Sequence, residues 1–207
     1  LFNLKPNIYI LGVYIYKLRV YMKEITKAEM NAVLILVKSP EVIYNANSLS
    51  KVIGITPMGT LNILKRLESE NIVKSKKIGK ATTYKVNVKD NYACKYLSLI
   101  LVREAQYANP HIKRWIQELK KIKNAGVIIL FGSVLEKTNP NDIDLLLVTD
   151  QKRFPKLQKE IKELNEINIK KIHPMYQTYN DIIKNIKKRY KPILNAIKGI
   201  IVFGEEK

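Results

Sequence analysis

The sequence predicts an α+β protein whose two parts differ in architecture. Up to about Val88, apolar residues recur at helical spacing in three successive segments, and a β-hairpin follows. From Gly126 onwards, strand-like and helix-like segments alternate. The 207 residues are enough for one large or two small domains. We expect an N-terminal domain over residues 22–89, a helical connector over 90–109 and a second domain over 110–207.

Residues 1–21 stand apart from this plan. Their apolar core, Ile8 to Tyr16, is shorter than the ~20 residues that a membrane span requires. No small-residue cleavage site follows it, as a signal peptide would need. The chain starts at Leu1, and Met22 precedes a good helix start. We interpret residues 1–21 as an extension that is either not native or a flexible arm, and we expect no membrane partner.

The N-terminal helices are bounded by residues with a physical reason to start or stop a helix. The segment ITKAEMNAVLILVKSP carries an apolar stripe and ends at a proline. A short helix, NSLSKVIG, is expected to begin at Asn47 or Ser48 and to close at Gly54. The next helix has Thr56 as its N-cap and a proline in its first turn, where no N–H is needed. Two β-prone runs around Gly79 predict the hairpin.

Residues 90–124 are predicted to be helical, with a break at Pro110. Cys94 lies in an apolar part of this stretch and is expected to be buried. Because it is the only cysteine, an intrachain disulfide is excluded, and a reducing, cytoplasmic compartment is favoured. Beyond the connector, strands are expected at 126–131, 143–149, 167–176 and 200–204, and helices at 153–164 and 180–198.

The formal net charge is +19, from 37 Lys and Arg against 18 Asp and Glu. A chain this basic favours anionic partners such as nucleic acid or nucleotide phosphates. A lysine-rich solvated surface is the alternative, because the abundance of Ile, Lys and Asn is typical of an AT-rich genome. Charge therefore indicates a class of partner without identifying one.

The segment SLSKVIGITPMGTLNILKRLESENIVKSKKIGKATTYKV resembles the winged helix-turn-helix of bacterial and archaeal transcription regulators, the MarR-like proteins among them. The resemblance implies binding to double-stranded DNA as a homodimer, with the helices of residues 92–124 as the dimer interface. Helical hairpins of this kind also serve as protein docking modules, so a scaffolding role stays open.

The second helix of such a motif presents its N-terminal residues to base edges in the major groove. Asparagine bonds adenine, methionine and threonine contact the thymine methyl group, and basic side chains suit phosphates. A lysine-rich hairpin that merely faces solvent is the alternative. The residues predicted to contact DNA are Thr56, Met58, Gly59, Asn62, Lys65 and Arg66 on the helix and Lys74, Lys76, Lys77 and Lys80 on the hairpin.

Two aspartates open an otherwise apolar strand in the segment ILFGSVLEKTNPNDIDLLLVTD. Strand alternation puts Asp142 and Asp144 on one face, with Ile143 directed into the core. A solvated turn accounts for Asp142 but not for Asp144, because a charge followed by four apolar residues is costly unless it is paired or metal-bound. Two carboxylates on one face therefore favour a divalent cation such as Mg²⁺.

The pattern of Gly132-Ser133 followed by Asp-x-Asp resembles the nucleotidyltransferase superfamily of DNA polymerase beta, and the small minimal domains of prokaryotes most closely. The resemblance covers residues 110–207. It implies a small mixed-sheet domain in which Asp142 and Asp144 are catalytic and hold Mg²⁺. Gly132 and Ser133 would bind the phosphates of a nucleoside triphosphate at a helix N-terminus.

Active members of that superfamily usually add a third carboxylate on a neighbouring strand. The corresponding segment here, NEINIKKIHPMYQT, has Lys170, Lys171 and His173 in its core and an acid, Glu166, only at its entry. Two functions therefore stay open. One is a transcription regulator with a nucleotide-binding, catalytically degenerate domain. The other is an active transferase that moves a nucleotide onto a protein or another acceptor, for example as an antitoxin with a small helical toxin as its partner.

Overall fold

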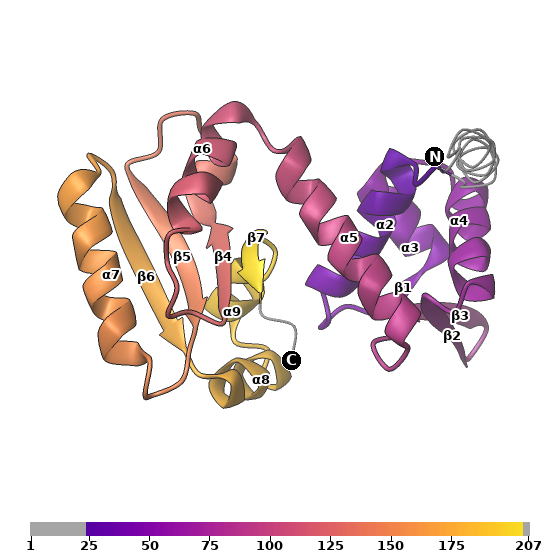
Figure 1. Cartoon of the computed structure of the whole chain (residues 1–207). Coiled ribbons are helices and arrows are strands. Elements are labelled where there is room, and N and C mark those ends of the chain that lie inside the picture. Colours follow the sequence, from indigo (N-terminus) through magenta and orange to yellow (C-terminus); the bar gives the residue numbers. More distant parts are fainter. Residues whose placement is uncertain (1–23, 205–207) are drawn as a thin grey trace, which may run out of the picture.

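The computed structural model describes residues 24–204, so the extension expected at residues 1–21 lies outside the described residues. The chain forms two lobes joined by one long helix (Figure 1). The first lobe contains α2 (Lys27–Lys38), β1 (Tyr44–Asn45), α3 (Ala46–Ile53), α4 (Pro57–Ser69), β2 (Val73–Ile78) and β3 (Ala81–Val86). The joining helix is α5 (Asn91–Tyr107). The second lobe contains α6 (Pro110–Leu119), β4 (Val127–Phe131), the 3₁₀ helix η1 (Gly132–Leu135), β5 (Asp142–Val148), α7 (Phe154–Ile167), β6 (Lys171–Gln177), α8 (Tyr179–Lys187), α9 (Lys191–Ala196) and β7 (Ile200–Gly204). The α+β prediction is confirmed.

The first lobe is a winged helix-turn-helix. Thr56 caps α4 by accepting a hydrogen bond from the Gly59 N–H at 3.1 Å, and Gly54 ends α3 with a φ of 74°, as expected. The cap of α3 differs from the prediction: it is Asn45, because its side chain and that of Ser48 exchange hydrogen bonds with each other's backbone N–H groups. The helices pack beside a three-stranded sheet of order β1-β3-β2, in which β2 and β3 form the hairpin wing.

A buried carboxylate links three helices of this lobe. Glu29 of α2 is 2% exposed and forms an ion pair with Arg66 of α4. The Tyr96 hydroxyl of α5 donates a hydrogen bond to the same carboxylate at 2.5 Å. Burial is the main reason that the pKa of Tyr96 is raised to about 12. Glu29 therefore fixes the recognition helix α4 against α2 and α5.

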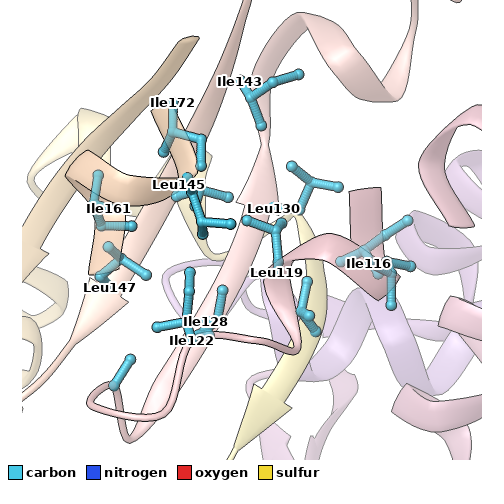
Figure 2. Close-up of a cluster of buried hydrophobic side chains, with 14 of the residues drawn as sticks. Ile116, Leu119, Ile122, Ile128, Leu130, Ile143, Leu145, Leu147, Ile161 and Ile172 are labelled. Atoms are coloured by element: carbon cyan, nitrogen blue, oxygen red, sulfur yellow. The ribbon is translucent and has the colours of Figure 1, made fainter. Parts of the chain in front are cut away.

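The second lobe is built on a sheet of order β6-β5-β4-β7, with β5 parallel to β6 and antiparallel to β4. On one face, the side chains of Ile143 and Leu145 meet those of α6 and α7 in the largest apolar cluster (Figure 2). On the other face, Leu146 packs against Ile193 and Ala196 of α9. Because successive strand residues alternate between faces, Asp142 and Asp144 lie on the α8/α9 side.

Two expected boundaries in this lobe, and the expected burial of Cys94 in α5, were wrong. The single helix expected at 180–198 is divided into α8 and α9 at Arg189, whose φ of 54° is left-handed. The strand expected from residue 167 begins at Lys171, because α7 continues to Ile167. Cys94 is exposed rather than buried, since α5 turns its neighbour Ala93 to the core and directs Cys94 to solvent.

A buried lysine holds the two lobes together. Lys38, at the end of α2, is 8% exposed, and its ammonium donates hydrogen bonds at 2.5 Å to Glu104 of α5 and at 2.6 Å to the Gly199 carbonyl before β7. Burial lowers the pKa of Lys38 and raises the pKa of Glu104, and the attraction between them opposes both shifts. The ion pair therefore fixes α2 to the joining helix α5, and the hydrogen bond to Gly199 ties the winged lobe to the second lobe.

Candidate functional site

The exposed end of α4 presents the side chains that were predicted to contact bases. Met58 is 65% exposed, Thr56 and Asn62 are exposed, and Lys65 follows one turn later. Gly59 leaves room for the capping hydroxyl of Thr56, since a Cβ at this position would lie only 3.1 Å from it. Within residues 24–204, none of these side chains is used to hold the helix against the core apart from the N-cap hydroxyl. The end of α4 is therefore available to a partner.

The hairpin adds cations beside α4 on both of its faces, since the successive residues Lys76 and Lys77 point to opposite sides. Lys74, Lys76, Lys77 and Lys80 are all exposed, and no ion pair engages them in the described part of the chain. Lys85 of β3 belongs to the same surface, since it is the direct cross-strand partner of Lys74. Like charges directly opposite each other destabilise a sheet unless an anion lies between them. Sequence reasoning missed Lys85, although its outward position follows from the burial of Tyr84 beside it.

Arg66 does not extend this cationic surface. Its guanidinium is 19% exposed and is used in the ion pair with Glu29, with Glu70 at 3.9 Å on its other side. Its expected contact with a DNA phosphate would require breaking a buried ion pair. We therefore define the cationic face as Lys65, Lys74, Lys76, Lys77, Lys80 and Lys85, without Arg66.

A second candidate site is the aspartate pair at the start of β5. Ile143 is fully buried between the two aspartates, while Asp142 and Asp144 are half-buried on the opposite face. Burial is the first cause that raises the pKa of Asp144, the neighbouring charge of Asp142 is the second, and His173 opposes both. The structure thus places two like charges together on a partly covered face, where a cation would relieve their repulsion.

Gly132 approaches this pair closely. Its φ of 80° is left-handed, and a Cβ at this position would overlap the Asp144 carboxylate. Ser133 follows in η1, as the sequence suggested, but η1 is a four-residue 3₁₀ helix and not the α-helix expected after Gly-Ser. The helix dipole invoked for binding phosphates at Ser133 is therefore largely missing, because so few peptide units are aligned. His111 of α6 holds this turn in place through a 3.0 Å hydrogen bond between Nε2 and the Val134 carbonyl.

The neighbouring strand β6 brings a histidine to the pair and no acid. Its sequence is KIHPMYQ, and its register sets His173 directly beside Asp144. The Nδ1 atom of His173 lies 3.3 Å from a carboxylate oxygen of Asp142. Lys171 turns away, since its ammonium binds the carbonyls of Asn165 and Asn168.

Glu166 belongs to the last turn of α7 and not to β6, and its side chain is exposed. Within residues 24–204, no three His, Cys, Asp or Glu side chains converge as a ready-made metal site. Asp142 and Asp144 are thus the two groups that could hold Mg²⁺. The cation would have to complete its six oxygen ligands from water or from a bound ligand.

A surface hollow of about 240 Å³ lies at the far end of the same strands. It is bordered by a T-shaped ring pair, Phe154 and Tyr176, with centroids 5.0 Å apart. Its two carboxylates already have partners: Asp150 accepts hydrogen bonds from Arg153, and Asp181 accepts one from the hydroxyl of Thr178, the N-cap of α8. This hollow is therefore separate from the aspartate pair, which stands at the opening of β5 and not at its end.

One family model matches residues 103–193, and it describes DUF6932, a family of unknown function. The match runs from the end of α5 to α9, so it includes the aspartate pair and excludes the winged lobe. No curated protein matches the chain. Within the described residues, no helix combines the length and the apolar character that crossing a membrane requires.

Solved structures similar to the chain include a winged helix-turn-helix domain and a transcription regulator. ZitR of Lactococcus lactis is 12% identical with a TM-score of 0.35, and the match covers 49% of this chain and 65% of ZitR. The homodimeric winged helix-turn-helix domain of Mb0332 from Mycobacterium bovis, a possible ArsR-family regulator, is 10% identical with a TM-score of 0.34, and the match covers 53% of this chain and 94% of that one. MepR of Staphylococcus aureus, a transcription regulator of a multidrug efflux pump, is 12% identical with a TM-score of 0.34. The match covers 58% of this chain and 96% of MepR. Likeness at this level does not carry a binding activity from one protein to another.

Proposed function

We propose that this chain is a DNA-binding transcription regulator whose second lobe binds a nucleoside triphosphate together with Mg²⁺. The observation that carries the DNA part is the cationic face. Its lysines stand beside the exposed end of a recognition helix without carboxylate partners in the described residues. Exposed lysines suit contacts with duplex phosphates, while the exposed side chains of Thr56, Met58 and Asn62 would contact base edges.

The test is DNA binding at several salt concentrations. Lys76→Ala with Lys77→Ala should weaken binding to all duplexes and reduce the slope of log affinity against log salt by about 2, because two phosphate contacts are lost. Asn62→Ala should instead reduce discrimination among sequences selected from a random library. The matched control, Lys156→Ala with Lys162→Ala on the exposed side of α7, removes the same charge far from the cationic face. A wild-type protein that ignores duplex DNA at low salt would refute the DNA part.

We propose that the active form is a homodimer that pairs through α5. On its solvent side α5 exposes Tyr92, Leu99 and Val102, at 57%, 48% and 55%. These residues lie at helical spacing and form an apolar stripe that a second copy would cover. Leu99→Glu with Val102→Glu should convert the protein to a monomer in sedimentation experiments, and an unchanged mass would place the interface elsewhere.

The aspartate pair supports the nucleotide part. Two half-buried carboxylates lie beside Gly132, whose missing side chain leaves room for the Asp144 carboxylate, so negative charge and backbone meet at one point. A bound Mg²⁺ would supply positive charge that neutralises the phosphates of the triphosphate. The chain itself would contribute Asp142 and Asp144 as ligands, Gly132 as the close approach for the phosphates, and Ser133 as a hydroxyl donor.

Calorimetric titration with a nucleoside triphosphate tests this part. Wild type should bind more tightly with Mg²⁺ than without it, and Asp144→Asn should remove that dependence without unfolding the lobe. Asp150→Asn, beyond the other end of β5, is the matched control and should keep the dependence. Equal affinity for wild type and Asp144→Asn, with and without Mg²⁺, would mean that the pair does not serve a nucleotide.

The second candidate function is an active nucleotidyltransferase that modifies a protein or another acceptor, including a toxin for which it would be the antitoxin. The proximity of His173 to the aspartate pair favours this second function, because an imidazole within reach of the site could accept the proton of an attacking hydroxyl. Incubation with labelled triphosphates and Mg²⁺, alone and with the product of the neighbouring gene, would show label transfer if this candidate is right.

A further inference from the structure

The turn between α8 and α9 concentrates positive charge outside both sites described above. The run Lys187-Lys188-Arg189-Tyr190-Lys191 sets four cations around one aromatic ring. All five side chains are exposed, with Tyr190 at 52%. Within residues 24–204, none of the four cations has a carboxylate in ion-pair range.

Local helix electrostatics account for only part of this charge. Lys187 and Lys188 end α8, where cations complement the negative end of the helix. Lys191 begins α9, where a cation opposes the positive end of the next helix. Arg189 takes a left-handed conformation at a position where glycine would cost less, yet the turn is closed by a 2.9 Å hydrogen bond from the Tyr190 N–H to the Asn185 carbonyl. The turn is thus closed by its own backbone hydrogen bond, and helix electrostatics explain neither Arg189 nor Lys191.

The turn also borders a shallow, largely open surface hollow of about 460 Å³. A volume of this size accommodates a group as large as a nucleotide. The side chains around it supply positive charge for a phosphate, a ring face for a base and one amide. The hollow is bordered by Asn185, Lys188, Arg189, Tyr190, Lys191 and Pro192.

The turn lies on the same side of the sheet as the aspartate pair. Leu146, two residues after Asp144, packs on Ile193 of α9, and Ile182 and Ile186 of α8 join that cluster. Because alternate strand residues share a face, the two helices that carry the turn cover the part of the face beyond Asp144. A ligand bound at the turn would therefore approach the lobe from the side on which Asp142 and Asp144 are accessible.

We propose that this turn is a binding site for single-stranded nucleic acid, separate from the duplex-binding face of the winged lobe. Lys188, Arg189 and Lys191 bind successive backbone phosphates, and an unpaired base stacks on Tyr190. A single strand fits better than a duplex, because the bases of a duplex already stack on each other and leave no free face for the tyrosine ring. The site does not depend on nucleotide binding at the aspartate pair.

Fluorescence anisotropy with a labelled oligothymidylate of about 12 nucleotides tests the site on the full chain. The variant Lys188→Ala with Arg189→Gly and Lys191→Ala removes three cations, and the glycine relieves the left-handed strain. Its affinity should fall at least tenfold, and its log–log salt slope should shrink by about 2, since each single-strand phosphate contact contributes about 0.7. The matched control, Lys113→Ala with Lys156→Ala and Lys162→Ala, removes the same charge from α6 and α7 and should lose less than threefold.

Two further variants separate stacking from charge and this site from the wing. Tyr190→Ala should weaken binding roughly tenfold, whereas Tyr190→Phe, which keeps the ring, should bind like wild type. The wing variant Lys76→Ala with Lys77→Ala should lose duplex binding but keep the single strand. Equal losses in the turn variant and the matched control, a loss confined to the wing variant, or a wild-type protein that does not bind the single strand would each overturn the proposal. An equal loss for Tyr190→Phe and Tyr190→Ala would overturn the stacking.

Discussion

Two largely buried glutamates of the junction and the winged lobe contrast with the aspartate pair of the sheet lobe. Glu29 and Glu104 are each held by a cation from the chain itself, Arg66 and Lys38. At the start of β5, by contrast, two like-charged aspartates stand side by side, and only one imidazole is near them. A charge matched inside the chain specifies packing, whereas unmatched charges of one sign raise the free energy of the free protein and are relieved by a partner.

The largest effect is expected from breaking a matched pair. Lys38→Met leaves Glu104 with its cation removed at a largely buried position, so the free energy of unfolding in urea should fall by about 3–5 kcal/mol. Adding Glu104→Leu should recover most of the loss, because a well-packed apolar pair replaces a buried ion pair. The surface pair of Lys121 and Glu118 is the control, and Lys121→Met should cost less than about 1 kcal/mol. If Lys38→Met were as stable as wild type, this ion pair would not contribute to the stability of the fold in solution.

A smaller effect of opposite sign is expected at the unmatched pair. The pKa of Asp144 is raised, so the folded state disfavours its ionised form, and wild type loses stability as the pH rises through the titration of this carboxyl. Asp144→Asn should therefore be more stable than wild type at neutral pH without Mg²⁺, by less than about 1 kcal/mol given its partial exposure. The gain should vanish below about pH 3, where the wild-type carboxyl is protonated.

Asp181 is the control for that pH dependence. Its pKa is lowered, chiefly by the hydrogen bond from the Thr178 hydroxyl, so its ionised form stabilises the fold. Asp181→Asn should lower the melting temperature at neutral pH, and this loss should disappear on acidification. Melting curves of both variants across the acid range measure the two opposite changes in stability, a gain for Asp144→Asn and a loss for Asp181→Asn. Parallel curves for Asp144→Asn and wild type at every pH would show that the pair is not repulsive.

The smallest effect is expected at Glu166, which belongs neither to the paired glutamates nor to the aspartate pair. Its side chain is exposed on the last turn of α7, and β6 carries no acid in its place. Glu166→Gln should change neither the affinity for nucleoside triphosphates nor the rate of any label transfer. A large loss of transfer would show that Glu166 reaches the aspartate pair as a third carboxylate.

Local chemistry made much of the fold predictable. Thr56 caps α4 and Gly54 ends α3 because each acts on backbone groups within a few residues of itself. Pro110 starts a new helix for the same reason. The opposite directions of Ile143 and its flanking aspartates follow from strand alternation alone, so the candidate pair could be named before any tertiary contact was known.

Other boundaries depended on competition between neighbouring elements. A run such as DIIKNIKKRYKPILNAIK carries helical periodicity from end to end, and nothing in the periodicity marks where Arg189 turns left-handed. Cys94 lies in an apolar stretch, but which side of α5 faces the core depends on where α2 and the sheet lobe pack against it.

The sequence by itself determined the classes of element, the Thr56 cap of α4, the positive charge of the hairpin and the shared face of the two aspartates, because these depend on residues close together along the chain. Only the tertiary structure decided how the charges are used. Arg66 is withdrawn from the cationic face by Glu29, His173 comes beside the aspartates through the parallel pairing of β5 and β6, and Lys38 reaches a carbonyl 161 residues away. Such partners are chosen by long-range packing, which buries a charge only where another part of the chain can neutralise it.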